Sequence, residues 1–166
     1  MPAAPNVIAA LDAAGVAYEV MPCDPDLADT ALFCEAYGVP PERSANAILV
    51  ASRRPLGERA VCVVLATSRL DVNRTVRQRL GVKKASFASA DETAEATGMT
   101  IGGVTPLGLP HGLPVWIDAA VMIPDWVIVG AGTRAAKIRL APEDLVRASA
   151  AEVIEGLARP VEAIST

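Results

Sequence analysis

Hydrophobic and polar positions in the first part of the chain predict two short helices with a strand between them. Apolar side chains recur at helical spacing over residues 7–14, where Asn6 can cap the helix and Gly15 can end it. Residues 17–21 alternate between polar and apolar side chains, which predicts a strand, and residues 31–37 predict the second helix.

Two apolar runs come next, over residues 46–51 and 60–66. The polar segment 52–59 between them contains a proline and a glycine, so the two runs predict a β-hairpin. Both runs are almost continuously apolar, which predicts strands that are buried on both faces.

Two further helices are predicted after the hairpin. Over residues 71–80, apolar side chains recur every four residues on one side, while arginines project from the rest. Ser89 and Glu92 have the spacing of a capping box, so another helix is predicted to begin there and to end at Gly98.

Three short strands are predicted in the second half, over residues 115–118, 126–129 and 137–140. The last one alternates polar and apolar residues, so we expect it to be half exposed. Segment 130–135 matches a dinucleotide-binding fingerprint, but that fingerprint requires a helix directly after its glycines. Because a strand follows instead, the segment is interpreted as the glycine turn of a hairpin.

Pro142 begins the last predicted helix, whose apolar face continues to Leu157 with a break near Ser149. Residues 159–166 are expected to form a loose tail. Strands and helices mix without strict alternation along the chain. This pattern predicts an α/β or α+β fold with a curved mixed sheet, in a single domain over residues 1–166.

The loop over residues 98–118 has the composition of a ligand-binding loop. Gly102 and Gly103 allow main-chain amides to approach a ligand closely, and three prolines stiffen the segment. Fixed amide donors are what binding of an ester carbonyl or a phosphate requires. The alternative interpretation is an ordered surface loop without a ligand, since glycine and proline mark turns generally.

Charge is distributed unevenly along a chain whose net charge is −4. Residues 43–84 carry ten basic and two acidic residues, whereas residues 1–42 carry seven acidic and no basic residues. The basic segment predicts a face that contacts a polyanion. The alternative is a solvated helix face and a charged hairpin, because an acidic protein is a poor general binder of nucleic acid.

Composition excludes several classes of protein. No run of about 18 apolar residues is present, so no membrane span is expected, and the N-terminus lacks the pattern of a signal peptide. Three cysteines without paired spacing indicate reduced thiols in a cytoplasmic protein. The single histidine, His111, excludes most histidine-based metal sites, and no metal is expected.

One set of motifs occurs in a specific order. The loop Gly102-Gly-Val-Thr-Pro-Leu-Gly108 is followed by a strand that ends at Asp118 and by a glycine turn at Gly132. Together with several other segments, these motifs resemble the YbaK / prolyl-tRNA-synthetase-associated editing domain family, and the resemblance extends from about Val16 to about Leu157. The other segments are the helix from Thr30 to Gly38-Val-Pro-Pro41, Ser44-Ala-Asn-Ala-Ile-Leu-Val50, Arg69-Leu-Asp71, Leu80-Gly-Val-Lys-Lys84, Gly98, Pro114-Val-Trp-Ile-Asp118 and Val129-Gly-Ala-Gly132.

The resemblance implies a curved mixed, mostly antiparallel, barrel-like sheet with helices packed around it. It implies a freestanding, trans-editing aminoacyl-tRNA deacylase that hydrolyses the ester of a mischarged small amino acid, such as alanine or cysteine, on tRNA, typically proline tRNA. The implied partners are the acceptor end of tRNA and prolyl-tRNA synthetase. No cofactor is implied.

The resemblance also implies the residues of the site. Residues expected to act on the ester are Asn46, Gly102, Gly103 and Thr105. Residues expected to bind the substrate around it are Thr30, Pro106, Gly108, Asp118 and Gly132. Residues expected to contact the phosphates of tRNA are Arg53, Arg54, Arg74, Arg77, Lys83 and Lys84.

Asn46 departs from the family pattern, because active members usually carry a lysine at this position. Asparagine donates and accepts hydrogen bonds but brings no positive charge. One alternative is therefore a weakened or inactive relative that binds tRNA ends or a synthetase without turnover. Others are a small-molecule binder or hydrolase on the same scaffold, replacement of the charge by Arg43 or Arg53, and a structural role for Asn46 at a strand edge.

Overall fold

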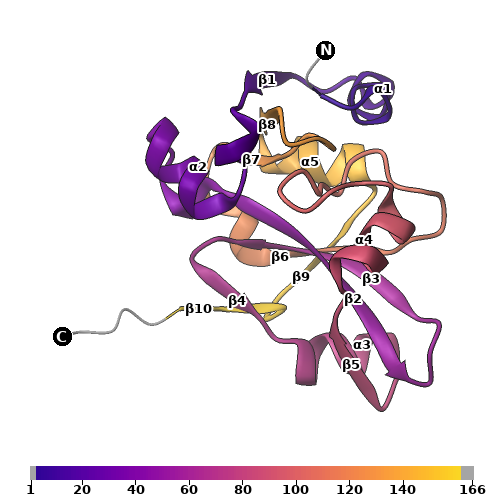
Figure 1. Cartoon of the computed structure of the whole chain (residues 1–166). Coiled ribbons are helices and arrows are strands. Elements are labelled where there is room, and N and C mark those ends of the chain that lie inside the picture. Colours follow the sequence, from indigo (N-terminus) through magenta and orange to yellow (C-terminus); the bar gives the residue numbers. More distant parts are fainter. Residues whose placement is uncertain (1–2, 162–166) are drawn as a thin grey trace.

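A computed structural model describes residues 3–161 of the 166-residue chain. Within this range the chain forms five α-helices and ten strands (Figure 1). The α-helices are α1 (Pro5–Ala14), α2 (Thr30–Tyr37), α3 (Arg77–Leu80), α4 (Ala90–Thr97) and α5 (Pro142–Ser149). The strands are β1 (Tyr18–Pro22), β2 (Ala45–Arg54), β3 (Arg59–Leu65), β4 (Ser68–Leu70), β5 (Lys84–Phe87), β6 (Val115–Asp118), β7 (Val127–Gly130), β8 (Ala136–Leu140), β9 (Glu152–Ile154) and β10 (Ala158–Pro160). Short helical turns are η1 (Pro25–Leu27), η2 (Pro41–Arg43), η3 (Val72–Val76, a π-helical turn) and η4 (Ala119–Met122).

The described strands form three sheets rather than one closed barrel. The largest has the order β5-β2-β3-β6-β9, with parallel pairing of β3 to β6 and of β6 to β9 and antiparallel pairing elsewhere. The antiparallel strands β1, β8 and β7 form the second sheet, and β10 pairs with β4 in the third. This mixed arrangement with helices around it confirms the predicted fold class.

The β2–β3 hairpin forms the centre of the fold. As predicted, β3 is buried on both faces over residues 60–65 and β2 over residues 49–52, whereas residues 46–48 are half-buried. Val61 and Val63 belong to the hydrophobic core shared with α1, β7 and β8. Cys62 and Val64 point to the other face, where they pack with Val76 and other residues of a second core. The hairpin therefore joins two cores, and Figure 1 shows it reaching the end of the molecule where α3 and β5 lie.

The prediction that the last helix continues to Leu157 is wrong beyond Ser149. Helix α5 ends there because Ala150 adopts a left-handed backbone conformation, with φ of 53°. The following residues form β9, which pairs with β6 and buries Ile154 in a core. The predicted loose tail is also wrong at Arg159 and Pro160, since these residues belong to β10, whereas residues 162–166 lie outside the described part.

Helix α1 begins two residues earlier than its sequence pattern indicated. Pro5 is its first residue and Ala4 occupies the capping position, so Asn6 does not cap the helix. The Asn6 side-chain amide instead donates a hydrogen bond of 2.8 Å to the carbonyl oxygen of Gly108. This bond attaches α1 to the loop that precedes β6.

In the described part of the chain, no helix combines the length and apolarity needed to cross a bilayer.

Candidate functional site

A cavity of about 280 Å³ lies between α2, the first half of β2, the β7–β8 hairpin and the loop before β6. Its walls are largely apolar and include Phe33 and several alanines. The volume is near the lower end of ligand pockets, which span about 300–1,000 Å³, so it suits a small group. The polar side chains that line it belong to Asp29, Thr30, Ser44, Asn46, Thr93 and Lys137.

Thr30 and Asn46 form a hydrogen-bonded pair in the cavity wall. The Thr30 hydroxyl, at the start of α2, donates a 2.6 Å hydrogen bond to Oδ1 of Asn46, near the start of β2. This bond fixes the orientation of the amide. No acceptor in the described residues takes a hydrogen bond from Nδ2, so Nδ2 is the donor that the pair offers to a ligand.

Within the loop over residues 98–118, here called the glycine loop, Ile101, Gly102 and Val104 line the cavity. The amide N–H of Gly103 donates instead to the carbonyl oxygen of Thr100, at 2.9 Å. The carbonyl oxygen of Gly103 accepts a 2.8 Å hydrogen bond from the N–H of Gly132. The loop therefore forms one wall of the cavity, and it is held in place by the turn between β7 and β8.

Asp118 and Thr105 lie away from the cavity lining. The buried Asp118 carboxylate accepts hydrogen bonds from the N–H groups of Ala158, at 3.1 Å, and Ala120, at 3.3 Å, so it fixes β10 and the start of η4. Thr105 is fully buried, and its hydroxyl has no hydrogen-bond partner among the described residues. The other predicted site residues outside the lining are Gly103, Pro106, Gly108 and Gly132.

Gly103 and Gly108 allow close approach between backbone segments. A Cβ atom at Gly103 would lie 2.6 Å from the backbone carbonyl atoms of Thr133, and one at Gly108 would lie 2.7 Å from the carbonyl oxygen of Asn6. Real side chains essentially never approach that closely. These glycines therefore let the loop pack against the β7–β8 turn and against α1.

Lys137 is the cavity residue that the sequence pattern missed. The alternation over residues 137–140 predicted a half-exposed strand, which is wrong, because only Arg139 is exposed and Lys137 is 7% exposed. Lys137 is buried because the α2 segment covers that face of β8, with the Phe33 ring centroid 5.3 Å from Nζ. Gly130 stands opposite Lys137 in the β7–β8 register and adds no side chain beside it. A lysine opposite a glycine in the predicted hairpin is the sequence signal that could have identified Lys137 as a buried residue.

The Lys137 ammonium and the Arg134 guanidinium connect the same two segments. Lys137 Nζ donates to the carbonyl oxygens of Ala28, at 2.7 Å, and Gly102, at 2.9 Å. Arg134 donates to the Asp29 carboxylate at 3.0 Å and to the carbonyl oxygen of Ile101 at 2.7 Å. The segment leading into α2 and the glycine loop are thus held together across the cavity.

No cysteine of the chain offers a reactive thiolate to this cavity at neutral pH. All three thiols are buried and unpaired. Burial raises the pKa of Cys23 and of Cys34, and it raises the pKa of Cys62 to about 12. Since the thiolate is the nucleophilic form, cysteine-based covalent catalysis is unfavourable here.

Arg43 and Arg53 do not supply the charge missing at Asn46. Arg43 donates to Asp125 at 2.6 Å and stacks on the Trp126 ring, and Arg53 is held elsewhere by Glu92. Neither arginine lines the cavity.

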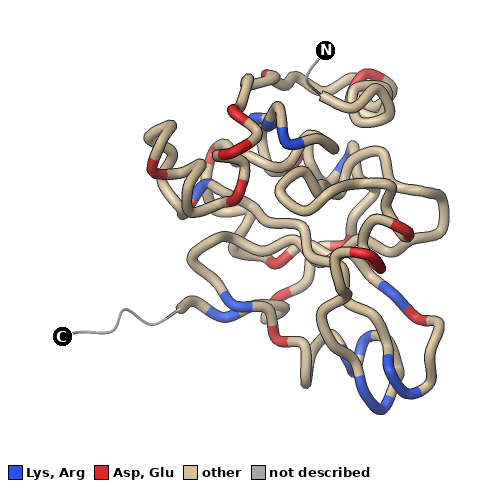
Figure 2. Tube along the Cα trace, in the orientation of Figure 1, with Lys and Arg blue, Asp and Glu red and all other residues tan. Residues whose placement is uncertain are grey.

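Basic residues gather at the other end of β2. Figure 2 shows Lys and Arg clustered around the tip of the β2–β3 hairpin and the turn between α3 and β5. Arg54 pairs with Lys84 in the β-sheet register, and the Lys83 N–H donates to the Arg54 carbonyl oxygen at 2.8 Å. Arg54, Lys83 and Lys84 are exposed and form the basic end, and Arg74, on η3, is also exposed. Arg54 is eight residue steps along the strand from Asn46, which corresponds to about 26 Å.

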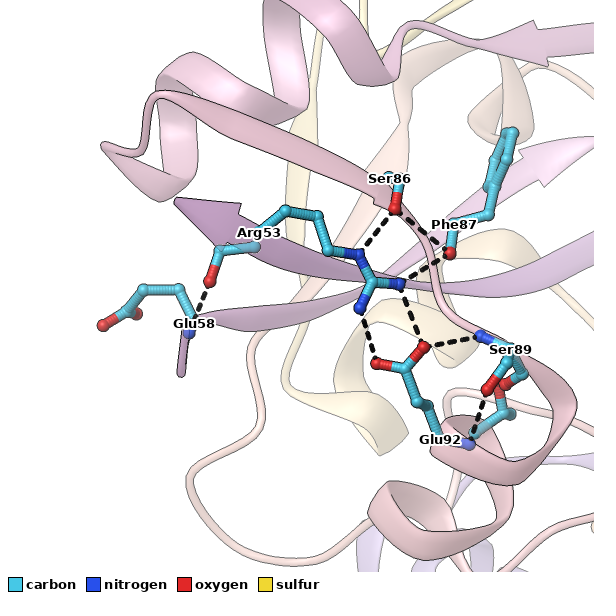
Figure 3. A network of polar contacts seen from close by, with 8 residues as sticks. Arg53, Glu58, Ser86, Phe87, Ser89 and Glu92 are labelled. Atoms are coloured by element: carbon cyan, nitrogen blue, oxygen red, sulfur yellow. Dashed lines mark hydrogen bonds and ion pairs between the residues drawn. The ribbon is translucent and has the colours of Figure 1, made fainter. Parts of the chain in front are cut away.

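Arg53 and Arg77, also predicted to contact tRNA, are engaged within the protein. The Arg53 guanidinium makes a bidentate pair with the Glu92 carboxylate, with both N···O distances 2.9 Å, and Nε donates to the Ser86 hydroxyl at 2.7 Å (Figure 3). Arg77 Nε donates to the carbonyl oxygen of Asn73 at 2.8 Å. The Arg53 network attaches the capping box of α4 to β2 and β5.

The Arg53–Glu92 pair predicts acid sensitivity of the fold. The hydrogen bonds from Arg53, and next from the Ser89 N–H, lower the pKa of Glu92 from 4.5 to about 2. A carboxylate with a lowered folded-state pKa stabilises the fold above its unfolded-state pKa, and this contribution is lost as pH falls from 4.5 toward 2. We expect Glu92→Gln to lower the free energy of unfolding at pH 7, with a difference from wild type that shrinks across this window. Urea unfolding of both proteins at several pH values measures this difference in the free energy of unfolding. A difference that does not change with pH would contradict the stabilising role of the Arg53–Glu92 pair.

Comparison with known proteins agrees with the sequence resemblance. The family model described as aminoacyl-tRNA editing domain matches residues 24–148. The uncharacterized protein YwhH of Bacillus subtilis (strain 168) is 34% identical over 119 residues, which cover 72% of this chain and 73% of YwhH.

Two solved structures show the same fold at lower identity. The hypothetical protein APE2540 superposes with a TM-score of 0.82 at 23% identity and covers 93% of this chain and 99% of its own. A candidate trans-editing enzyme for prolyl tRNA synthetase superposes with a TM-score of 0.78 at 22% identity and covers 95% and 99%. The chain belongs to the aminoacyl-tRNA editing domain family, as its ordered motifs had predicted.

Proposed function

We propose that this protein is a freestanding, trans-editing deacylase that hydrolyses the ester of a mischarged small amino acid on tRNA. The observation that carries the proposal is the small cavity, in which the Thr30–Asn46 pair faces a wall formed by Gly102 and Val104. An aminoacyl ester is already activated, so positioning the acyl group and polarising its carbonyl can provide much of the acceleration.

The reaction needs only water as a second substrate. A water oxygen attacks the ester carbonyl carbon, and the carbonyl π electrons move to the carbonyl oxygen. The tetrahedral intermediate then expels the ribose oxygen, which takes a proton that came with the water. The products are the free amino acid and a tRNA with a free terminal hydroxyl. In this proposal Asn46 Nδ2 donates a hydrogen bond to the carbonyl oxygen as it becomes negative.

The dimensions of the cavity support alanine, cysteine or serine as the amino acid. Ala28, Ala45, Ala47 and Ala88 line it, so little side-chain volume projects from these positions. Phe33 and the strand residues limit its size from the other sides. Exclusion by size provides about 1–3 kcal/mol per methylene, so discrimination between these amino acids also depends on the polar groups of the wall.

Proline tRNA and prolyl-tRNA synthetase are the proposed partners. The name of one structural neighbour, a candidate trans-editing enzyme for prolyl tRNA synthetase, supports this choice, together with the family of the chain. The basic end supports contact with tRNA. About 26 Å of β2 separates it from the cavity, and this distance corresponds to about eight nucleotides at about 3.4 Å each. The cavity would take the acyl end while the basic end contacts the acceptor stem.

A deacylation panel tests the proposal. Alanyl-, cysteinyl- and seryl-tRNA are prepared on proline tRNA and on the cognate acceptors, and release of the amino acid is followed against buffer alone. We expect hydrolysis above the buffer rate for at least one mischarged proline tRNA. No release above buffer for every substrate would overturn the proposal.

The uncharged side chain of Asn46 favours a second candidate, a relative that binds aminoacyl-tRNA without turnover. This candidate predicts tRNA binding by the wild-type protein without hydrolysis, and it predicts that Asn46→Lys restores hydrolysis. A deacylase that already works with asparagine gains nothing from that substitution. Measuring both proteins in the same panel separates the two candidates, and absence of any tRNA binding at low salt would favour a small-molecule substrate instead.

Removing charge from the basic end is expected to weaken tRNA binding without changing the chemical step. The triple variant Arg54→Gln, Lys83→Gln, Lys84→Gln should raise the Kd and flatten its salt dependence by a slope of about 0.7–0.9 for each phosphate that the protein no longer neutralises. The single-turnover rate at saturating protein should stay the same. Filter binding over a salt series measures the slope. Arg147→Gln on α5 is the matched control, and an equal effect in both variants would contradict the basic end as a tRNA-binding surface.

A further inference from the structure

The structural contacts of Lys137 do not explain why a charged side chain is buried at this position. Its ammonium is buried beside the cavity, and in the described residues no carboxylate lies within ion-pair distance of it. The nearby Asp29 carboxylate pairs with Arg134 instead. A buried charge without a counter-charge is costly, and such groups concentrate where a protein binds or stabilises an opposite charge.

The hydrogen bonds of Lys137 leave one donor free. An ammonium has three N–H donors, and the carbonyl oxygens of Ala28 and Gly102 take two of them. Both acceptors belong to cavity-lining residues, so Nζ lies at the junction of two cavity walls. The Phe33 ring, which also lines the cavity, lies 5.3 Å from Nζ and provides a weak attraction rather than a neutralising charge.

We propose that Lys137 is a catalytic residue of this cavity, whose ammonium contacts the ester carbonyl oxygen and stabilises the negative charge that develops there. This inference rests on the deacylase function proposed above. The ammonium keeps its proton throughout: water adds to the carbonyl carbon, the charge forms on the carbonyl oxygen beside Nζ, and the ribose oxygen leaves with a proton from the water. Lys137 and Asn46 then contact the same oxygen from β8 and β2.

The surroundings of Lys137 give the proposal a pH signature. Burial lowers the pKa of this ammonium below its ordinary value of 10.5, and the charged or titratable groups around it are Asp29, Arg134 and the thiols of Cys23 and Cys34. As pH rises through the lowered pKa, the charge is lost, and the enzymatic rate should fall while the buffer-catalysed rate continues to rise. Arginine does not titrate in this range, so Lys137→Arg should lack the alkaline decline in whatever activity it keeps.

The test uses three proteins and two measurements on the best substrate of the panel. Lys137→Met has a side chain of similar length without charge, and it should lower the single-turnover rate about 10²–10³-fold, the cost of losing an oxyanion donor. The Kd for tRNA should stay the same, and so should the rate of a control with Arg139→Met, which removes an exposed cation from the same face of β8. Lys137→Arg should retain more activity than Lys137→Met, with a rate that no longer declines at alkaline pH.

Each outcome is decisive. A Lys137→Met rate equal to wild type overturns the proposal, and so does a rise in Kd with the rate at saturation unchanged, because that result places the ammonium on a phosphate. If Lys137→Met fails to fold, the pH profiles of wild type and Lys137→Arg decide, since identical alkaline limbs overturn the assignment. If wild type hydrolyses nothing in the panel, the deacylase proposal itself has failed. If wild type is active and Lys137→Met is equally active, only the Lys137 assignment has failed.

Discussion

Replacing Asn46 with alanine is expected to lower the kcat for deacylation about 10²–10³-fold, the range measured when a donor to a developing oxyanion is removed. The physical reason is the fixed orientation of the amide. The Thr30 hydroxyl holds Oδ1 at 2.6 Å, so Nδ2 is preset as a donor toward the cavity. An alanine at residue 46 removes this donor and leaves the Thr30 hydroxyl without its acceptor.

A graded series separates this role from a general loss of structure. Thr30→Val keeps the Asn46 amide but releases its orientation, so its kcat should fall less than that of Asn46→Ala. Gln78→Ala removes an exposed amide on α3 and should leave kcat unchanged. Steady-state kinetics on the best substrate, with thermal unfolding in parallel, gives the comparison. An Asn46→Ala variant with wild-type kcat would place the amide outside the reaction.

Replacing Gly103 with alanine is expected to destabilise the fold by about 1–3 kcal/mol, as overpacking of a well-packed position does. A Cβ atom at this position would lie 2.6 Å from the backbone carbonyl of Thr133, and a backbone atom cannot rotate away as a side chain can. The loop must then move off the β7–β8 turn. Because Gly102 and Val104 form a cavity wall on either side of Gly103, kcat should fall together with stability.

The matched control for this variant is Gly112→Ala. Gly112 has a φ of 89° and open space around its Cβ position, so alanine there strains the backbone without a clash. It should lower the free energy of unfolding but leave kcat intact, because Gly112 lies outside the cavity lining. Urea unfolding and deacylation rates of both variants are compared. A Gly103→Ala protein with wild-type stability would show that the loop relaxes without cost.

Local patterns predicted the parts of this fold that short-range physics determines. The capping box of Ser89 and Glu92 begins α4, since both of its hydrogen bonds form within one turn. The second apolar run of the β2–β3 hairpin is buried on both faces as predicted, and so is the first run from Leu49 onward. The pattern failed after Ser149, where apolar residues at helical spacing pair with β6 in a strand. There, a partner distant in sequence outweighed local periodicity.

The order of motifs placed the chain in its family, and it named Thr30, Asn46 and Gly102 among the residues that meet at the cavity. It also named Asp118, whose carboxylate the structure uses for two backbone N–H groups instead. Motif order reports which residues accompany a fold, but it does not say which way a side chain points. The direction of a side chain depends on the packing of segments that are far apart in the sequence.

The sequence alone determined the family, the main helices and strands, the central hairpin and the basic segment, because each is encoded in neighbouring residues or in their order. The tertiary structure alone decided that Arg53 is bound to Glu92 while Arg54, Lys83 and Lys84 stay exposed. It also decided that Lys137 is buried at the cavity, where α2 covers a strand face that alternation predicted to be half exposed. The physical reason is that burial and charge pairing are set by contacts across the chain, which a local pattern does not contain.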